Sequence, residues 1–352
     1  MPRYLPRAAV IEAIERELSI APLIVVAGAR GSGKTTLLKS LLTRSKAGDP
    51  VALMKLEPLA STPELLESEF RRLAPPLFRG PRNAGTNAFD ALLDGLRRRP
   101  KSSLLLLDDI TEIRTFSYFR DVEDPLQHLI TALQSRGRTV ATSRHPFWVK
   151  RELPDLPLVE IPPMGAAELS EAGYPEAEAL HAATGGMALH VRRLGETLEA
   201  HGLGIEEALS AELEEGGRIE AECRATLADL LHRARGYNAC KAILRVLADE
   251  EELKLTEIAR RMARTPGSTR DYLRWLEEVD LIEAREKRFS YVDKLLRLWM
   301  RIYGRGVIAT PNDVRTEVAR HLGSLAPVSV ERSASSGYRL PPSPSEDLVE
   351  ID

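Results

Sequence analysis

The sequence predicts an α/β protein in which a parallel sheet, covered by helices on both faces, precedes a helical region and a small module of helices and a hairpin. Short apolar segments alternate with amphipathic helical patterns up to Pro162-Pro163, which close this part. Buried parallel strands are continuous apolar runs of this kind. The expected strands are 23–27, 51–56, 103–107, 139–143 and 158–161, and the helices between them include 8–18, 62–73 and 86–98.

The bulk composition limits the class of protein. The 352 residues are 43% apolar, and 49 Lys and Arg against 52 Asp and Glu leave a net charge of −3. A net charge this small gives no overall indication of binding to nucleic acid or to a membrane. Cys223 and Cys240 have no disulfide or metal-ligand spacing. The longest apolar run, 20–29, contains a proline and a glycine and is too short to span a bilayer. We expect a soluble, cytoplasmic protein with no membrane partner.

The strongest motif is the segment 28–35, GARGSGKT, which fits the phosphate-binding pattern G-x-x-x-x-G-K-[ST]. It follows an apolar strand and precedes a helical pattern that places Leu37, Leu38, Leu41 and Leu42 on one face. The glycines allow successive backbone N–H groups to point at phosphate oxygens, and the helix N-terminus adds partial positive charge. A tight strand-to-helix turn would explain the glycines but not the lysine and hydroxyl that follow them.

Each residue type of this loop has an expected role. Lys34 would reach the β- and γ-phosphates, and the Thr35 hydroxyl would ligate Mg²⁺. The predicted nucleotide-binding residues are Gly28, Gly31, Ser32, Gly33, Lys34, Thr35 and Thr36.

Two further strands end in polar residues at the same predicted edge of the sheet. The strand 104–107 is followed by Asp108 and Asp109, and the strand from Thr139 ends in Thr142-Ser143-Arg144. Ligands of open α/β sheets bind at the carboxyl ends of the strands. We expect Asp108 to hold Mg²⁺, Asp109 to orient or deprotonate the attacking water, and Arg144 to sense a γ-phosphate. Taken singly, an acidic turn and a surface arginine would explain these residues equally well.

Together the segments GARGSGKT, LLLLDDI and TVATSR resemble the P-loop NTPases of the AAA+ and STAND groups. The paired aspartates and the Thr-Ser-Arg strand end are more similar to STAND and NB-ARC proteins than to AAA+ enzymes, which carry Asp-Glu. The resemblance covers about residues 4–300 and implies that ATP and Mg²⁺ are bound. Since Asp109 is one methylene shorter than the usual glutamate, we expect slow hydrolysis. An Asn-Lys-x-Asp guanine motif is absent from the sequence.

A lid motif of the same families is present in altered form at 185–189, Gly-Gly-Met-Ala-Leu. Ala188 stands where the STAND version has proline, and Leu189 stands where many AAA+ lids have a sensor arginine. Arg192 and Arg193, one turn further on, are candidates to replace that arginine. The opening Tyr4-Leu5-Pro6-Arg7 resembles the start of small prokaryotic AAA+ ATPases that end in a winged helix.

The pattern of 237–300 predicts a winged helix. Apolar positions define helices around Ile243 and Ile258, Thr265-Pro266 begins a third helix, and 281–286 and 288–292 form a hairpin joined at Lys287. Winged helices commonly bind DNA through the third helix and the wing. The candidate contacts with double-stranded DNA are Arg270, Arg274, Lys287 and Arg288. Winged helices of STAND proteins also pack on the nucleotide domain instead, and neighbouring acids dilute this patch.

We therefore expect four parts: a P-loop ATPase core (1–163), a helical lid (164–235), a winged helix (236–303) and a helical or disordered acidic tail (304–352). The expected function is a slow ATPase switch, in which ATP and Mg²⁺ hold the lid and winged helix against the core. Its output is DNA, or alternatively a protein partner or self-association in signalling or defence. A small-molecule kinase would leave the winged helix unexplained. The tail 343–352 is acidic, and we expect it to be either a solvated end or a short docking peptide, whose charge would also allow it to cover the basic wing.

Overall fold

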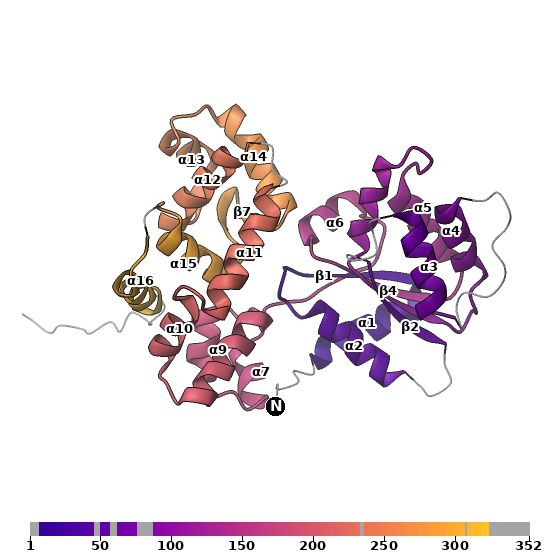
Figure 1. Cartoon of the computed structure of the whole chain (residues 1–352), viewed down its shortest axis with the longest axis horizontal. Coiled ribbons are helices and arrows are strands. Elements are labelled where there is room, and N and C mark those ends of the chain that lie inside the picture. Colours follow the sequence, from indigo (N-terminus) through magenta and orange to yellow (C-terminus); the bar gives the residue numbers. More distant parts are fainter. Residues whose placement is uncertain are drawn as a thin grey trace, which may run out of the picture.

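Five parallel strands form the central sheet of the N-terminal lobe, in the order β2-β3-β4-β1-β5 (Figure 1). The computed structural model describes residues 7–45, 50–56, 62–75, 87–232, 236–306 and 308–323. The register pairs Ala27 with Ser143 and Leu107 with Ala141, so three strands end at one edge of the sheet. The strands are β1 (Leu23–Ala27), β2 (Val51–Lys55), β3 (Leu104–Asp108), β4 (Arg138–Ser143) and β5 (Leu158–Glu160).

Helices cover both faces of this sheet because alternate strand residues point to opposite sides. Ile24 and Val26 of β1 pack against one pair of helices, whereas Leu23 and Val25 pack against the opposite layer. The pair consists of α1 (Ala8–Ile20) and α2 (Lys34–Arg44). The opposite layer consists of α3 (Pro63–Leu73), α4 (Ala88–Arg98), the 3₁₀ helix η1 (Ile110–Tyr118), α5 (Pro125–Ser135) and α6 (Pro146–Glu152).

The predicted α/β architecture of this lobe is confirmed, and the strand boundaries agree within about two residues. One packing prediction was wrong. Leu42 was expected on the buried face of α2, but it is exposed, since Leu37, Leu38 and Leu41 already fill the contact with the sheet. The helix η1, which begins directly after Asp109, was not expected from the sequence.

A buried arginine fixes the turn that leads into β4. The Arg99 guanidinium donates to the carbonyl oxygen of Leu133 at 2.9 Å and to Oγ1 of Thr139 at 2.7 Å. Burial lowers the pKa of Arg99 to about 10, so the side chain is a cation held mainly by uncharged oxygens. It thereby ties the end of α4 to the start of the strand that contains Thr142 and leads to Arg144.

The C-terminal lobe is largely helical (Figure 1). It has a single hydrophobic core that runs from Met164 to Val318. This core crosses the expected boundary at residue 235 without interruption, because Leu227 of one helix and Ile243 of the next both belong to it. The first helices are α7 (Ala166–Glu171), α8 (Ala177–Thr184), α9 (Ala188–His201), α10 (Ile205–Leu213) and α11 (Arg218–His232). After the module described next, α15 (Lys294–Tyr303) and α16 (Pro311–Gly323) complete the lobe.

The segment 237–291, here called the C-terminal module, combines three helices with a small antiparallel sheet of order β6-β8-β7. A two-residue turn joins β7 to β8, with Glu286 and Lys287 both at positive φ, as the favoured hairpin turn requires. The Thr265 hydroxyl caps α14 by accepting from the backbone N of Ser268 at 3.3 Å. Its elements are α12 (Tyr237–Asp249), β6 (Leu253–Lys254), α13 (Leu255–Arg261), α14 (Pro266–Glu278), β7 (Ile282–Arg285) and β8 (Arg288–Tyr291).

Two predictions concern segments at the ends of the chain. The opening Tyr4-Leu5-Pro6 and the acidic segment 326–352 lie outside the described residues. Within the described part, every helix is too short or too polar to cross a bilayer.

Candidate functional site

The loop after β1 has the backbone conformation expected of a phosphate-binding loop. Gly31 and Gly33 both have positive φ, 81° and 98°, where residues with a Cβ are strained. Ser32 Oγ is buried and lacks a hydrogen-bond partner among the described residues. A buried hydroxyl without a partner is costly, so the loop fits a ligand that supplies acceptor oxygens, as phosphate does. Thr36, the last of the predicted contacts, is exposed at the start of α2.

Lys34 is folded back over this loop. Its Nζ donates to the carbonyl oxygens of Gly28 at 2.7 Å and Ala29 at 2.9 Å, and the residue is 8% exposed. Burial lowers the pKa of Lys34 to about 8, and the carboxylates of Asp109 and Asp108 oppose that shift. The ammonium group is therefore a desolvated cation at the loop, and it attracts an added phosphate charge strongly because little water screens the two groups.

Asp108 joins three elements at the carboxyl edge of the sheet. Its Oδ2 accepts from Thr35 Oγ1 of α2 at 2.6 Å, and its Oδ1 accepts from Thr142 Oγ1 of β4 at 2.7 Å. The Thr142 hydroxyl in turn accepts from the backbone N of Asp109 at 2.9 Å. A hydroxyl and a carboxylate oxygen thus lie side by side, and hard oxygen ligands of this kind suit Mg²⁺.

Asp109 and Arg144 form a buried ion pair next to this network. Arg144 Nε donates to Asp109 Oδ2 at 2.5 Å, and the side chains are 10% and 12% exposed. The other carboxylate oxygen of Asp109 accepts from Thr111 Oγ1 at 2.9 Å. Asp109 also has a positive φ of 67°, which turns its side chain from the strand direction toward Arg144. The structure therefore brings Lys34, Asp108, Asp109 and Arg144 together, as the sequence predicted.

Glu112 was missed by the sequence analysis. It lies on η1, and its Oε1 accepts from Arg144 Nη2 at 2.8 Å, so two carboxylates share one guanidinium. The spacing of three residues from Asp109 places it over the same edge because η1 begins there. A carboxylate within one helical turn of a strand-end aspartate was the available signal.

The helix that follows the altered lid motif, α9, contacts the phosphate-binding loop directly. The backbone N of Leu189, at the start of α9, donates to the carbonyl oxygen of Gly31 at 2.9 Å. A Cβ on Gly31 would lie 2.9 Å from the Cβ of Leu189. Arg192 and Arg193, the predicted substitutes for a sensor, pair with Glu196 and Glu222 of the C-terminal lobe.

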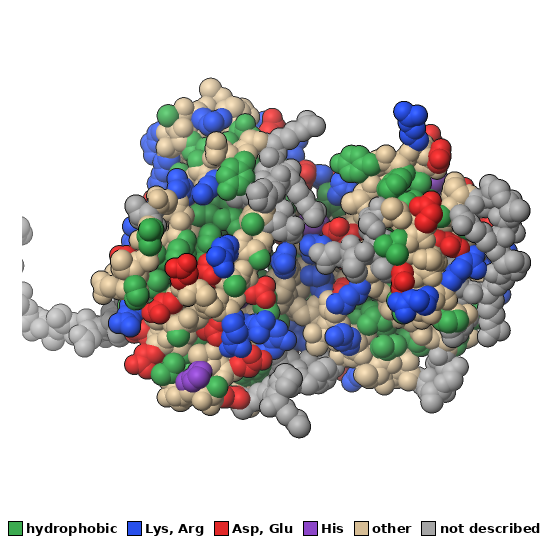
Figure 2. All heavy atoms as spheres, viewed as in Figure 1, with side chains coloured by type: hydrophobic (Ala, Val, Ile, Leu, Met, Phe, Trp, Pro, Cys, Tyr) green, Lys and Arg blue, Asp and Glu red, His purple; other side chains and the backbone are tan. Residues whose placement is uncertain are grey.

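The four candidate DNA contacts all belong to the C-terminal module. Arg270 and Arg274 are on α14 and Lys287 and Arg288 are at the hairpin, and all four are exposed. Arg288 Nη1 also donates to the carbonyl oxygen of Glu252 at 2.8 Å. In the view of Figure 2, basic and acidic side chains are intermingled over the C-terminal lobe.

Comparisons with known proteins agree with this geometry. Residues 22–173 match the model of the NACHT domain. The matched region is thus similar to P-loop NTPase domains of the STAND type, and the N-terminal lobe has the P-loop NTPase fold. The matched residues include all five strands of the sheet and Lys34, Asp108 and Arg144. No curated protein sequence matches the chain.

Solved structures extend the likeness of fold beyond the NTPase domain. A Walker-type ATPase of Pyrococcus abyssi is 16% identical, with a TM-score of 0.65 over 86% of this chain and 99% of that chain. The ORC1 protein of Aeropyrum pernix, solved in complex with DNA, is 16% identical with a TM-score of 0.42, over 89% of this chain and 92% of that chain. The RuvB Holliday junction branch migration motor of Thermotoga maritima is 11% identical with a TM-score of 0.39, over 82% and 91%. At such identities the first of these shows a shared fold.

The Thr142 hydroxyl is predicted to stabilise the site by linking both aspartates of the NTPase domain. Thr142→Val keeps the volume but leaves a buried carboxylate oxygen and a buried N–H without a partner, so we expect a loss of about 2 kcal/mol in the free energy of unfolding. Urea denaturation measures it. The control is Thr131→Val at an exposed position of α5, which we expect to change stability by less than about 0.5 kcal/mol. Equal effects of the two substitutions would contradict the role of Thr142.

Proposed function

We propose that the chain is an ATP-binding, slowly hydrolysing molecular switch whose nucleotide state controls the position of its C-terminal lobe. One observation carries this proposal: the phosphate-binding loop contacts the C-terminal lobe directly, through the Gly31–Leu189 hydrogen bond. A change of ligand at the loop therefore acts on the lid helix without an intermediate element. The preference for ATP over GTP rests on the family resemblance.

Within this proposal each polar group at the sheet edge has a role. Lys34, with the backbone N–H groups of the loop, binds the phosphates, and Thr35 and Asp108 hold Mg²⁺, which would neutralise charge on the phosphate oxygens. The contact at 2.6 Å between Thr35 Oγ1 and Asp108 Oδ2 supports this assignment. Asp109 orients the attacking water, and Arg144 binds the γ-phosphate in exchange for part of its contact with Asp109 and Glu112.

We further propose that the C-terminal module is a winged helix and that the chain divides at residues 163, 235 and 303. The order of helices and strands in the module and its β6-β8-β7 sheet support this interpretation. Since the lid, the module and α16 share one core, they would move as a unit relative to the NTPase domain.

The nucleotide site makes a direct binding prediction. Lys34→Ala is expected to abolish measurable affinity for ATP, because the buried ammonium is the principal cation at the loop. Asp108→Ala is expected to weaken binding mainly when Mg²⁺ is present. Isothermal titration calorimetry measures both, and circular dichroism checks that the variants are folded. Wild-type affinity in Lys34→Ala would refute the site assignment.

The rate of ATP hydrolysis distinguishes the roles of Asp109 and Glu112, the two carboxylates that bind Arg144. We expect wild-type kcat below the ~1 s⁻¹ low end of typical enzymes. Asp109→Asn is expected to lower kcat about 100-fold with ATP affinity retained, because a general base contributes at least that much. Steady-state phosphate release measures it. If Glu112→Gln lowers kcat further than Asp109→Asn does, the water-orienting role belongs to Glu112.

A second candidate function, binding of double-stranded DNA, is favoured by the exposed cations of α14 and the hairpin. Against it, the end of α14 docks on α6, where Arg151 Nη1 lies 2.6 Å from Glu278 Oε1, as in an internally packed winged helix that serves a protein partner. These two outputs differ in their response to salt.

If the module binds DNA, Arg270→Ala should reduce the slope of log affinity against log salt by about one unit, since one phosphate contact is lost. Arg97→Ala, an exposed arginine on α4, is the control and should leave the slope unchanged. Fluorescence anisotropy with mixed-sequence duplex, with and without ATP, measures both. Absence of binding at 50 mM salt in either nucleotide state would favour a protein partner.

A further inference from the structure

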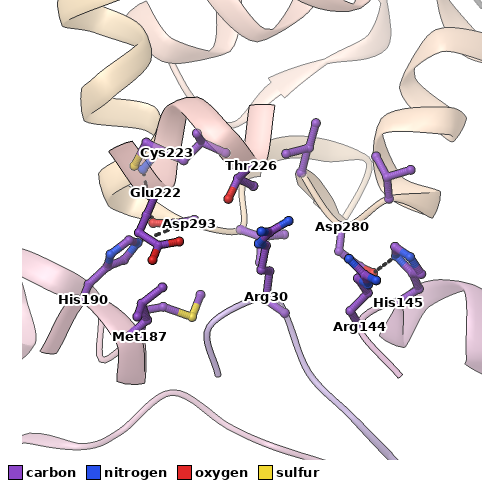
Figure 3. A pocket seen from close by; sticks show the side chains of 16 residues that line it. Arg30, Arg144, His145, Met187, His190, Glu222, Cys223, Thr226, Asp280 and Asp293 are labelled. Carbon is purple, nitrogen blue, oxygen red and sulfur yellow. Dashed lines mark hydrogen bonds and ion pairs between the residues drawn. The ribbon is translucent and has the colours of Figure 1, made fainter. Parts of the chain in front are cut away.

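A carboxylate of the C-terminal lobe lies at the edge of the nucleotide site. Asp280 follows α14, and its side chain is 10% exposed in the pocket between the lobes, next to Arg144 and His145 (Figure 3). Arg30 of the phosphate-binding loop lines the same pocket. Asp280 is therefore placed where the NTPase domain, the loop and the C-terminal module meet.

Two contacts of Asp280 with the NTPase domain involve the segment that follows β4. Its Oδ2 lies 3.5 Å from Nδ1 of His145, and its Oδ1 accepts from the backbone N of Phe147 at 3.5 Å. The adjacent ion pair between Arg151 and Glu278 strengthens the same contact. Because His145 directly follows Arg144, the residue proposed to bind γ-phosphate and the residue that meets Asp280 are covalent neighbours.

The backbone holds Asp280 firmly in this position. Its N–H donates to Glu277 O and the next N–H, of Leu281, donates to Leu276 O, both at 3.0 Å, so the helix end is closed. Its φ of 54° lies in the left-handed region, which favours glycine and which asparagine and aspartate tolerate better than most residues. Glycine would suit the turn with less strain but would bring no charge to the pocket.

Asp280 is also electrostatically coupled to the phosphate-binding loop. Burial raises the pKa of Asp280, and His145, the Phe147 amide and the Lys34 ammonium oppose that shift. Conversely, Asp280 is one of the carboxylates that oppose the lowering of the Lys34 pKa. A charge on the C-terminal lobe thus acts on the central cation of the nucleotide site.

We propose that Asp280 is an intramolecular competitor of the nucleotide phosphates. In the arrangement seen here its carboxylate faces the positive groups that surround the loop. Added phosphates would place like charges beside it, so triphosphate binding and docking of the C-terminal lobe oppose each other. This inference rests on the proposed ATP site, and its direction is the reverse of the expectation from the sequence that ATP holds the lobe in place.

The test is the affinity of the full-length chain for ATP, ADP and adenosine, measured by isothermal titration calorimetry for wild type and Asp280→Asn. Asparagine tolerates the left-handed backbone and keeps an acceptor for the Phe147 amide. We expect ATP to bind about tenfold more tightly to the variant, because the substitution removes a like charge beside the phosphates. The gain should be smaller for ADP and absent for adenosine.

The matched control is Glu278→Gln, which removes the ion pair with Arg151 at the same contact but leaves the charge near Lys34. An equal gain in ATP affinity for both variants would mean that undocking alone is responsible, and would overturn the proposal. So would an unchanged ATP affinity in a folded Asp280→Asn variant, or the same gain for adenosine. If Asp280→Asn does not fold, Asp280→Gly suits the left-handed backbone and serves in its place.

The experiments also distinguish an error in this inference from an error in the proposed function. Wild-type protein that does not bind ATP would refute the ATP site itself, and this inference with it. Wild-type binding that is lost in Lys34→Ala, together with no gain in Asp280→Asn, would refute the competitor alone.

Discussion

The Asp108 carboxylate is the contact on which the nucleotide edge depends. Thr35 and Thr142 each donate to one of its oxygens, which joins α2, β3 and β4 at a single point. Parallel pairing makes this possible, since the register of β1, β3 and β4 brings their carboxyl ends to one edge. The positions of Lys34, Asp109 and Arg144 follow from the same register. The site is therefore a property of the sheet rather than of any one loop.

Much of this edge could be predicted from the sequence because its chemistry directly follows apolar strands. Asp108 ends β3 and Arg144 directly follows β4, so the parallel sheet places them together, and the loop after β1 brings Lys34 to the same edge. Glu112 was not predicted, since its position depends on a 3₁₀ helix that no periodic pattern of apolar residues indicated. Leu42 was assigned to the core because its spacing fits a helical face, whereas the available contact area ends at Leu41.

The contacts between the two lobes could not be predicted from the sequence for a different reason. Asp280 and His145 are 135 positions apart, and neither belongs to a motif or to a periodic pattern. Their contact depends on how the whole C-terminal lobe, with its single core, packs against the whole NTPase domain. The secondary-structure propensity of single segments carries no information about how two lobes pack. The residues that matter for it are polar and lie at helix ends, where sequence patterns predict only a cap or a turn.

Gly31 illustrates how one residue can be constrained from two directions. Its positive φ suits a loop whose amides face a ligand, and its missing side chain makes room for Leu189 of α9. A glycine of this loop is usually explained by the nucleotide alone. In this protein the same absent methyl group also sets how closely two lobes approach. Natural variation at position 31 and at position 189 should therefore be correlated, so that a larger residue at one is tolerated only with a smaller residue at the other.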